Sequence, residues 1–320
     1  MLSSDADSLY WMSRYLERAE HTARMIDVNI VLMLDQSPAF ADLRWSRLLS
    51  SLRVTLPEGE SLGARGITEL LTLDRAGSAS IIACLTSARD NARQVREQIS
   101  SEMWEQLNRL YLHMSAADAG DIWNEQPHEF FRAIKEGIQL FQGITDCTMP
   151  RNQGWQFMDV GRFIERASKT AALVDAHYDE LAEAQERDNG VTDYLDWVGL
   201  LKSRTAFEAY CQVYTADLRP DRIAEFLLLN ADFPHSIRYA VHRLQAALKA
   251  IGRATGARKA GSVDRLTGRL QSMLDYGQID EIMAGNMQAF LADIQQQCLH
   301  IHRSIYQVYI TPPIESILQA

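Results

Sequence analysis

The sequence predicts an all-α protein, an internally duplicated multi-helix bundle with approximate pseudo-twofold symmetry. Three observations lead to this prediction. No segment sustains the period-two alternation of apolar and polar residues that is typical of a β-strand. One helical motif occurs at residues 9–27 and again, 148 residues later, at residues 157–175. Weaker similarity follows both motifs along the chain, so we expect two tandem copies of one unit.

The two motifs, LYWMSRYLERAEHTARMID and FMDVGRFIERASKTAALVD, agree in their charged residues as well as in their apolar ones. Most differences are conservative, as in the pair Tyr15/Phe163. Seven of the 19 aligned positions are identical: Arg14/Arg162, Glu17/Glu165, Arg18/Arg166, Ala19/Ala167, Thr22/Thr170, Ala23/Ala171 and Asp27/Asp175.

Each motif carries an apolar stripe with the three- and four-residue steps of a helix surface. The stripes are Leu9, Met12, Leu16, Ala19, Ala23, Ile26 and Ile30 in the first motif, and Phe157, Val160, Ile164, Ala167, Ala171 and Val174 in the second. The paired alanines leave little side-chain bulk, which lets a neighbouring helix approach closely. The repeated Arg, Glu and Arg face away from this stripe. Because a solvated face would diverge freely between two copies, we expect this polar face to form a second buried contact or a site.

The elements of the first half follow from breaks in the helical pattern. A first helix is expected over residues 5–35, from N-capping Asp and Ser residues to the break at Pro38. Helices are also expected over residues 41–56 and 67–73, on either side of the turn-rich residues 57–66. Residues 78–114 are expected to form one or two helices and residues 116–127 a loop. A helix over residues 130–145 then ends the first half.

The second half repeats this order with a shift that grows to 152, 156 and 160 residues, as loop insertions in a duplicated ancestor would produce. The matching pairs include Trp45/Trp197, Leu48/Leu200, Ser51/Ser203, Ile67/Ile223, Ser80/Ser236 and Phe130/Phe290. We therefore assign residues 1–150 to the first repeat and residues 151–320 to the second. The two repeats form either separate lobes or one interlocked domain.

Composition excludes several classes of protein. The chain has 320 residues and a formal net charge of −10, which disfavours nucleic-acid binding and attraction to anionic membranes. No apolar run approaches the roughly 20 residues that a membrane-spanning helix needs, and the N-terminus lacks the pattern of a secretory signal. The four cysteines lie far apart, as expected for reduced thiols. We therefore expect a cytoplasmic protein.

The repeated charged residues are the first candidates for a carboxylate- or anion-binding site. They are Arg14, Glu17, Arg18, Arg162, Glu165 and Arg166. In one interpretation they form a structural brace, either within one helix or between helices. In the other, the planar guanidinium forks bind a carboxylate or phosphate. No catalytic motif accompanies them, so the catalytic residues stay unknown.

Arg89, Arg93 and Arg96 are secondary candidates, because steps of four and three place them on one face of a helix. They would face solvent or a partner helix, or would pair in the interior with Glu17 or Glu165. We expect no metal site, since neither motif has the Glu-x-x-His pattern of carboxylate-bridged metals in helical bundles. No cofactor is expected.

The twin segments YLERAEHTARMID and FIERASKTAALVD, together with ARDNARQVREQISSEMWEQLN and FLLLNADFPHSIRYAV, resemble the prokaryotic alpha-E family. That family is named for an all-helical domain with a recurring Glu-Arg motif, which here falls on Glu17–Arg18 and Glu165–Arg166. Its genes typically lie beside those of circularly permuted ATP-grasp proteins, transglutaminase-like proteins and a proteasome-like peptidase. The resemblance therefore implies a system that makes or attaches peptide bonds using ATP.

Two functions follow from this resemblance. The chain is either a non-catalytic partner that docks an ATP-grasp ligase or presents its peptide, or an enzyme that acts on a carboxylated peptide intermediate through a Glu/Arg cavity. An enzyme should hold a carboxyl group with a shifted pKa in a concave pocket. A scaffold should instead pair every Glu and Arg and show an exposed apolar groove. We expect the partner role, because no nucleophile or base motif is visible.

Overall fold

A computed structural model describes residues 1–33, 38–56, 62–124, 126–186, 194–215, 217–257 and 260–311. Over these residues the chain is helical and contains no β-strand, which confirms the all-α class. No helix in this part of the chain is long and apolar enough to cross a membrane.

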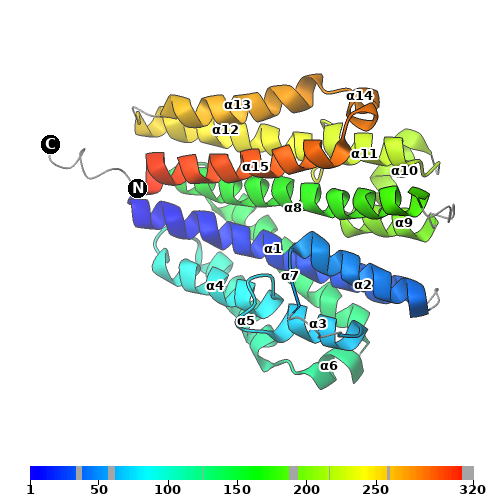
Figure 1. Cartoon of the computed structure of the whole chain (residues 1–320). Helices are drawn as coiled ribbons and strands as arrows, with labels where there is room; N and C mark the ends of the chain where they lie inside the picture. Colours follow the sequence, from blue (N-terminus) through cyan, green and yellow to red (C-terminus); the bar gives the residue numbers. More distant parts are fainter. Residues whose placement is uncertain are drawn as a thin grey trace.

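Two long helices, α1 (Ser3–Met33) and α8 (Gln153–Glu186), lie side by side through the middle of the molecule (Figure 1). They carry the two copies of the motif. Their contacts advance in the same direction along both helices, because Gly154 lies against Leu9, Gly161 against Tyr10 and Glu165 against Arg18. The helices are therefore parallel, and they pack on each other more extensively than any other pair.

The first half continues with shorter helices, most of which lie on the α1 side of this pair (Figure 1). They are α2 (Pro38–Leu52), α3 (Ala64–Leu73), α4 (Ile81–Gln94), α5 (Ser101–Ala116), α6 (Ala119–Asn124) and α7 (Pro127–Thr148). The helical stretch expected over residues 78–114 is two helices. The loop expected over residues 116–127 is wrong in part, because its apolar Ile122 is buried and the segment contains the six-residue helix α6.

The helices of the second half lie mostly on the α8 side. They are α9 (Tyr194–Ser203), α10 (Phe207–Tyr214), α11 (Pro220–Leu229), α12 (Ile237–Thr255), α13 (Ala260–Tyr276), α14 (Ile279–Ala284) and α15 (Met287–Ile305), followed by a π-helical turn at Tyr306–Ile310. Helices α4 and α7 pack on α1, and α12 and α15 pack on α8.

The second helix of each half crosses to the other half. Helix α2 packs more extensively on α8 than on α1, and α9 packs more extensively on α1 than on α8. One continuous hydrophobic core includes side chains from both halves. Among the described residues, neither long helix is therefore covered by its own half alone. The duplication itself stays an inference from the repeated sequence.

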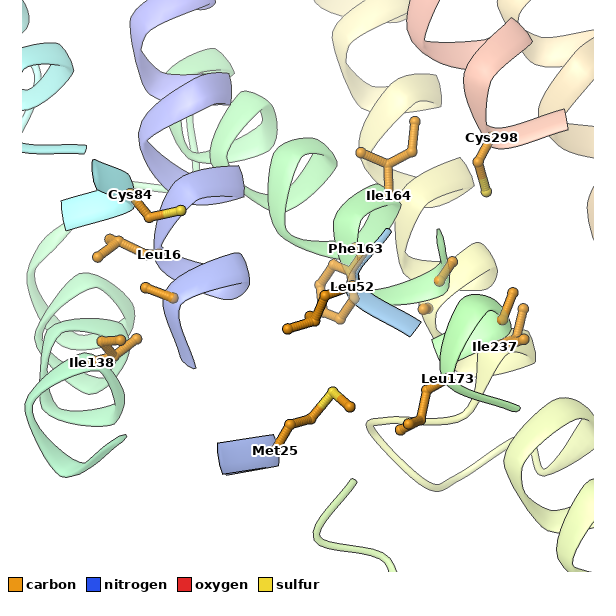
Figure 2. Close-up of a cluster of buried hydrophobic side chains, with 14 of the residues drawn as sticks. Leu16, Met25, Leu52, Cys84, Ile138, Phe163, Ile164, Leu173, Ile237 and Cys298 are labelled. Carbon is orange, nitrogen blue, oxygen red and sulfur yellow. The ribbon is translucent and has the colours of Figure 1, made fainter. Parts of the chain in front are cut away.

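Both apolar stripes are buried in this core, as the helical spacing predicts. Figure 2 shows Leu16 of α1 with Cys84 of α4 and Ile138 of α7 in one part of it, and Ile164 of α8 with Cys298 of α15 in another. Cys84 and Cys298 are buried free thiols.

Gly161 makes the closest approach between α8 and α1. A Cβ atom at this position would lie 2.2 Å from the backbone carbonyl oxygen of Tyr10. No side chain fits at that distance, so the two helices pack backbone to backbone at this point. The glycine places the motif residues that follow it within reach of α1.

We expect Gly161→Ala to destabilise the fold by about 1–3 kcal/mol, because α8 must move away from α1 to admit the methyl group. Gly143→Ala, in the interior of α7, is the matched control, since its added Cβ would meet nothing within 4 Å. That substitution should be neutral or stabilise by up to about 1 kcal/mol through helix propensity. Urea unfolding of both variants measures the difference, and equal stabilities would contradict the close approach.

Candidate functional site

The repeated charged residues meet across the α1–α8 contact. Glu165 of α8 accepts a hydrogen bond from Arg14 Nε at 2.8 Å and another from Arg18 Nε at 2.7 Å, both from α1. In the opposite direction, Glu17 of α1 accepts hydrogen bonds from Arg166 Nε at 2.6 Å and Arg166 Nη2 at 2.8 Å. Each carboxylate is thus held by the other copy of the motif, and the charges form an interhelical brace.

The outer ends of two arginines are anchored by loops. Arg18 Nη1 donates to the carbonyl of Ser78 at 3.2 Å, before α4, and Arg166 Nη1 donates to the carbonyl of Pro234 at 3.0 Å, before α12. Each loop is folded by an Asx turn, in which Asp74 or Asn230 accepts from the backbone N–H two residues later. The loops therefore point their carbonyl oxygens at the guanidinium groups.

The brace is closed to solvent at its carboxylates, since Glu17 and Glu165 are each 1% exposed. Burial alone would raise the pKa of Glu165, but the guanidiniums of Arg14 and Arg18 outweigh it and hold that pKa well below the ordinary value for glutamate. Glu165 is therefore ionised throughout the neutral pH range.

A second buried network, which the sequence did not reveal, lies beside Glu17. Arg204 follows α9 and donates from Nη1 to His21 Nδ1 and from Nη2 to His235 Nδ1, each at 2.9 Å. Glu20 and Arg24 form an ion pair in the same region. A guanidinium only donates, so both Nδ1 atoms must accept, and both imidazoles are neutral with the proton on Nε2.

The charges of this network follow from burial. Burial lowers the pKa of Arg204 to about 10, and burial together with the nearby guanidinium charge holds the pKa of His21 and His235 well below the ordinary value. Arg204 has no counterpart in the first repeat, because the aligned position is Leu52. The i,i+4 spacing of Glu20 and Arg24 was the only sequence signal for any part of this network.

The secondary candidates do not join the brace. Arg89 of α4 donates to Asn108 Oδ1 at 2.8 Å and lies over the ring of Tyr111, so it contacts α5. Arg93 is exposed. Arg96 lies beyond the end of α4 and stacks on Trp104. The interior pairing of these arginines with Glu17 or Glu165 is not formed, because other arginines occupy both carboxylates.

Arg162 is the motif arginine with the weakest pairing. Its Nε lies 3.8 Å from Glu17 Oε2 and makes no hydrogen bond, and its Nη2 donates to Gln142 Oε1 at 2.7 Å. Burial and the neighbouring Arg166 lower the pKa of Arg162. Arg162 lines a cavity between α1, α7, α8 and α12 that neither glutamate of the motif reaches.

Comparison with known proteins supports the resemblance seen in the sequence. A family model named Alpha-E, described as "a predicted alpha-helical domain with a conserved ER motif", matches residues 1–310. Two similar relatives are the uncharacterized protein Mb2597 of Mycobacterium bovis, 24% identical, and the uncharacterized protein Rv2567 of Mycobacterium tuberculosis, 23% identical. Each match covers 94% of this chain but only 35% of the relative's length. No solved structure matches the chain.

We expect Glu17→Gln to destabilise the fold by about 3–5 kcal/mol, because it leaves the buried Arg166 without a compensating charge. Glu165→Gln should cost less, since Arg14 and Arg18 are about 15% exposed and regain some hydration. As a control, Glu69→Gln removes an exposed ion pair with Arg65 and should cost about 0–1 kcal/mol. Chemical unfolding at pH 7 gives all three values. Equal, negligible costs would contradict a buried brace.

Stability should fall as the pH drops below the ordinary histidine pKa of about 6.5. In the folded state His21 and His235 resist protonation, so the unfolded state binds more protons between that pH and the lower folded pKa. His235→Asn keeps an acceptor for Arg204 but cannot titrate. It should reduce the slope of unfolding free energy against pH below 6.5, by at most about 1.4 kcal/mol per pH unit. As a control, His113→Asn at an exposed position should leave that slope unchanged. The same slope in the native chain and in both variants would contradict the neutral network.

Proposed function

We propose, because the chain belongs to the Alpha-E family, that it is a non-catalytic helical partner of an ATP-grasp-type ligase system that forms peptide or amide bonds. In this role it docks the ligase or presents its peptide substrate. A transglutaminase-like protein is a second proposed partner in the same system, and the cytoplasm is the proposed location.

The observation that carries this proposal is the burial of both glutamates of the Glu-Arg motif and their pairing with arginines. A general acid or base must reach the reacting atom and must have a pKa near the working pH. Glu17 and Glu165 are buried and held by arginines from the opposite helix, and the pKa of Glu165 is depressed. This placement supports a structural role for both carboxylates over a catalytic one.

The lengths of the relatives also support a partner role. The matched region makes up 35% of the two mycobacterial proteins, so in them it lies within a much longer chain. A domain within a longer polypeptide can pack against the other domains of the same chain. We propose that the present chain packs in a similar way against a separate partner protein.

One observation favours the alternative, an enzyme acting on a carboxylated peptide intermediate. Asp159 lines the same cavity as Arg162, and burial raises the pKa of Asp159 despite its ion pair with Arg243. A carboxyl group of this kind is a candidate acid or base. The ion pair argues against that role, because Arg243 Nη2 already donates to Asp159 Oδ2 at 2.7 Å.

The chain alone should neither hydrolyse ATP nor form amide bonds. Mixed with its cognate ATP-grasp protein, it should co-elute with that protein in size-exclusion chromatography and change the peptide-dependent ATP turnover of the ligase. Asp159→Asn, once shown to be folded, should leave both effects unchanged. Amide formation or ATP hydrolysis by the isolated chain, lost in Asp159→Asn, would support the enzyme and overturn the partner role.

A further inference from the structure

The cavity beside Arg162 has the size of a small-ligand site. Its volume is about 330 Å³, and it lies where α1, α7, α8 and α12 meet. Pockets for small molecules typically measure about 300–1,000 Å³. The wall combines the charged groups with side-chain amides and hydroxyls, among them Gln139, Gln142 and Thr145, and with the indole of Trp155. Such a wall offers hydrogen bonds to a polar ligand and an apolar surface for its stem.

Arg162 faces this cavity with no hydrogen bond to a carboxylate. Glu17 lies 3.8 Å from its Nε, and both oxygens of Glu17 already accept hydrogen bonds from Arg166. The hydrogen-bond partner that Arg162 does have is neutral, since Gln142 only supplies an amide oxygen. The side chain of Arg162 is 30% exposed, so a carboxylate bound in the cavity could form the charge-assisted hydrogen bonds that Glu17 does not.

Arg14, the corresponding arginine of the first motif, has close partners for its guanidinium nitrogens. Arg14 makes two close contacts with Glu165 and donates from Nη1 to the hydroxyl of Tyr10 at 3.1 Å. The ring of Trp11 covers its guanidinium at 4.6 Å. Two aromatic rings thus cover Arg14, whereas Arg162 has the ring of Phe163 at 5.5 Å and borders the cavity.

Two carboxylates, Asp146 and Asp159, and two arginines, Arg162 and Arg243, line the cavity, so the charges of its wall balance. Each carboxylate already has a close arginine, because Asp159 pairs with Arg243 at 2.7 Å and Asp146 pairs at 2.6 Å with Arg151, which does not line the cavity. Arg162 is therefore the charged residue of the wall that has no carboxylate within hydrogen-bond distance. A guanidinium binds the planar fork of a carboxylate well.

We propose that this cavity binds the carboxylate of a short peptide at Arg162, with the peptide amides on the glutamine and threonine side chains of α7. The choice of a peptide, rather than another carboxylic acid, rests on the proposed function. The geometry requires only a carboxylate on a stem small enough for the cavity.

The test is isothermal titration calorimetry of the full chain with two matched probes. Acetyl-alanyl-alanine carries a terminal carboxylate, and acetyl-alanyl-alaninamide has the same shape without the charge. The acid should bind at least about tenfold more tightly than the amide, which is the fold-change expected for one hydrogen bond to a charged group. Inorganic phosphate serves as an anion without a peptide stem.

Two variants test the role of Arg162. Arg162→Gln should reduce binding of the acid to the level of the amide. Gln142→Glu should also abolish binding of the acid, because it puts a carboxylate where the amide oxygen of Gln142 now accepts a hydrogen bond from Arg162. This second variant satisfies the arginine and should raise the melting temperature, so loss of binding cannot be ascribed to unfolding. Arg132→Gln, at an exposed pair on the same α7 helix, is the control that should change nothing.

The proposal is overturned if the acid and the amide bind equally, if neither binds, or if both variants bind the acid as the native chain does. Tighter binding of phosphate than of the acid would also overturn it. Because no ligase is present, a failure here removes the ligand site and leaves the docking role standing. Conversely, peptide binding without any effect on a ligase would keep the site and refute the docking role.

Discussion

The reciprocal pairing of glutamate and arginine between α1 and α8 is the interaction on which the rest of the structure depends. Taking a carboxylate or a guanidinium out of water costs several kcal/mol, and only a close opposite charge offsets that cost. Here each helix supplies the charge that the other one needs. The helices are therefore held parallel and in register, because a shift of one along the other would break hydrogen bonds to both carboxylates.

This constraint explains why the two halves interlock. If α1 and α8 separated, Glu17 and Glu165 would lose their arginines together, and α2 and α9 would lose the long helices on which they pack. Buried ion pairs often add little net stability compared with apolar packing, and their best-attested role is to specify one arrangement. The brace fits that role, since it determines which residues of α1 and α8 face each other.

Much of the fold could be predicted from the sequence because it depends on local patterns. The three- and four-residue steps identified both long helices and their buried stripes, and the repeat identified the charged residues that matter. The pairing of the charged residues could not be predicted, because Arg14 and Glu17 are also close enough on one helix to pair with each other. Which helix lies opposite is a long-range property. The helix was also expected to continue through Arg96, but it ends at Gln94 and the arginine turns onto Trp104.

The buried network around Arg204 was missed for a related reason. Arg204 and its two histidine partners come from the end of α9, from α1 and from the loop before α12, so no spacing in the sequence connects these three residues. The difference between Arg14 and Arg162 was hidden as well. The motif is the same, but the neighbours of Arg14 are Tyr10 and Trp11, where the second copy has Met158 and Asp159. Side chains outside the identical positions decide which arginine is enclosed and which faces a cavity.

A double-mutant cycle between Glu17 and Arg166 measures how strongly the brace couples α1 to α8. Each residue is replaced by methionine, singly and together, and the unfolding free energies are compared. We expect the two single variants to be strongly destabilised and the double variant to recover much of the loss. The coupling free energy should then lie near the upper end of about 0.5–3 kcal/mol, the range for residues in one network. A coupling close to zero, with additive losses, would contradict a brace that holds the two helices in register.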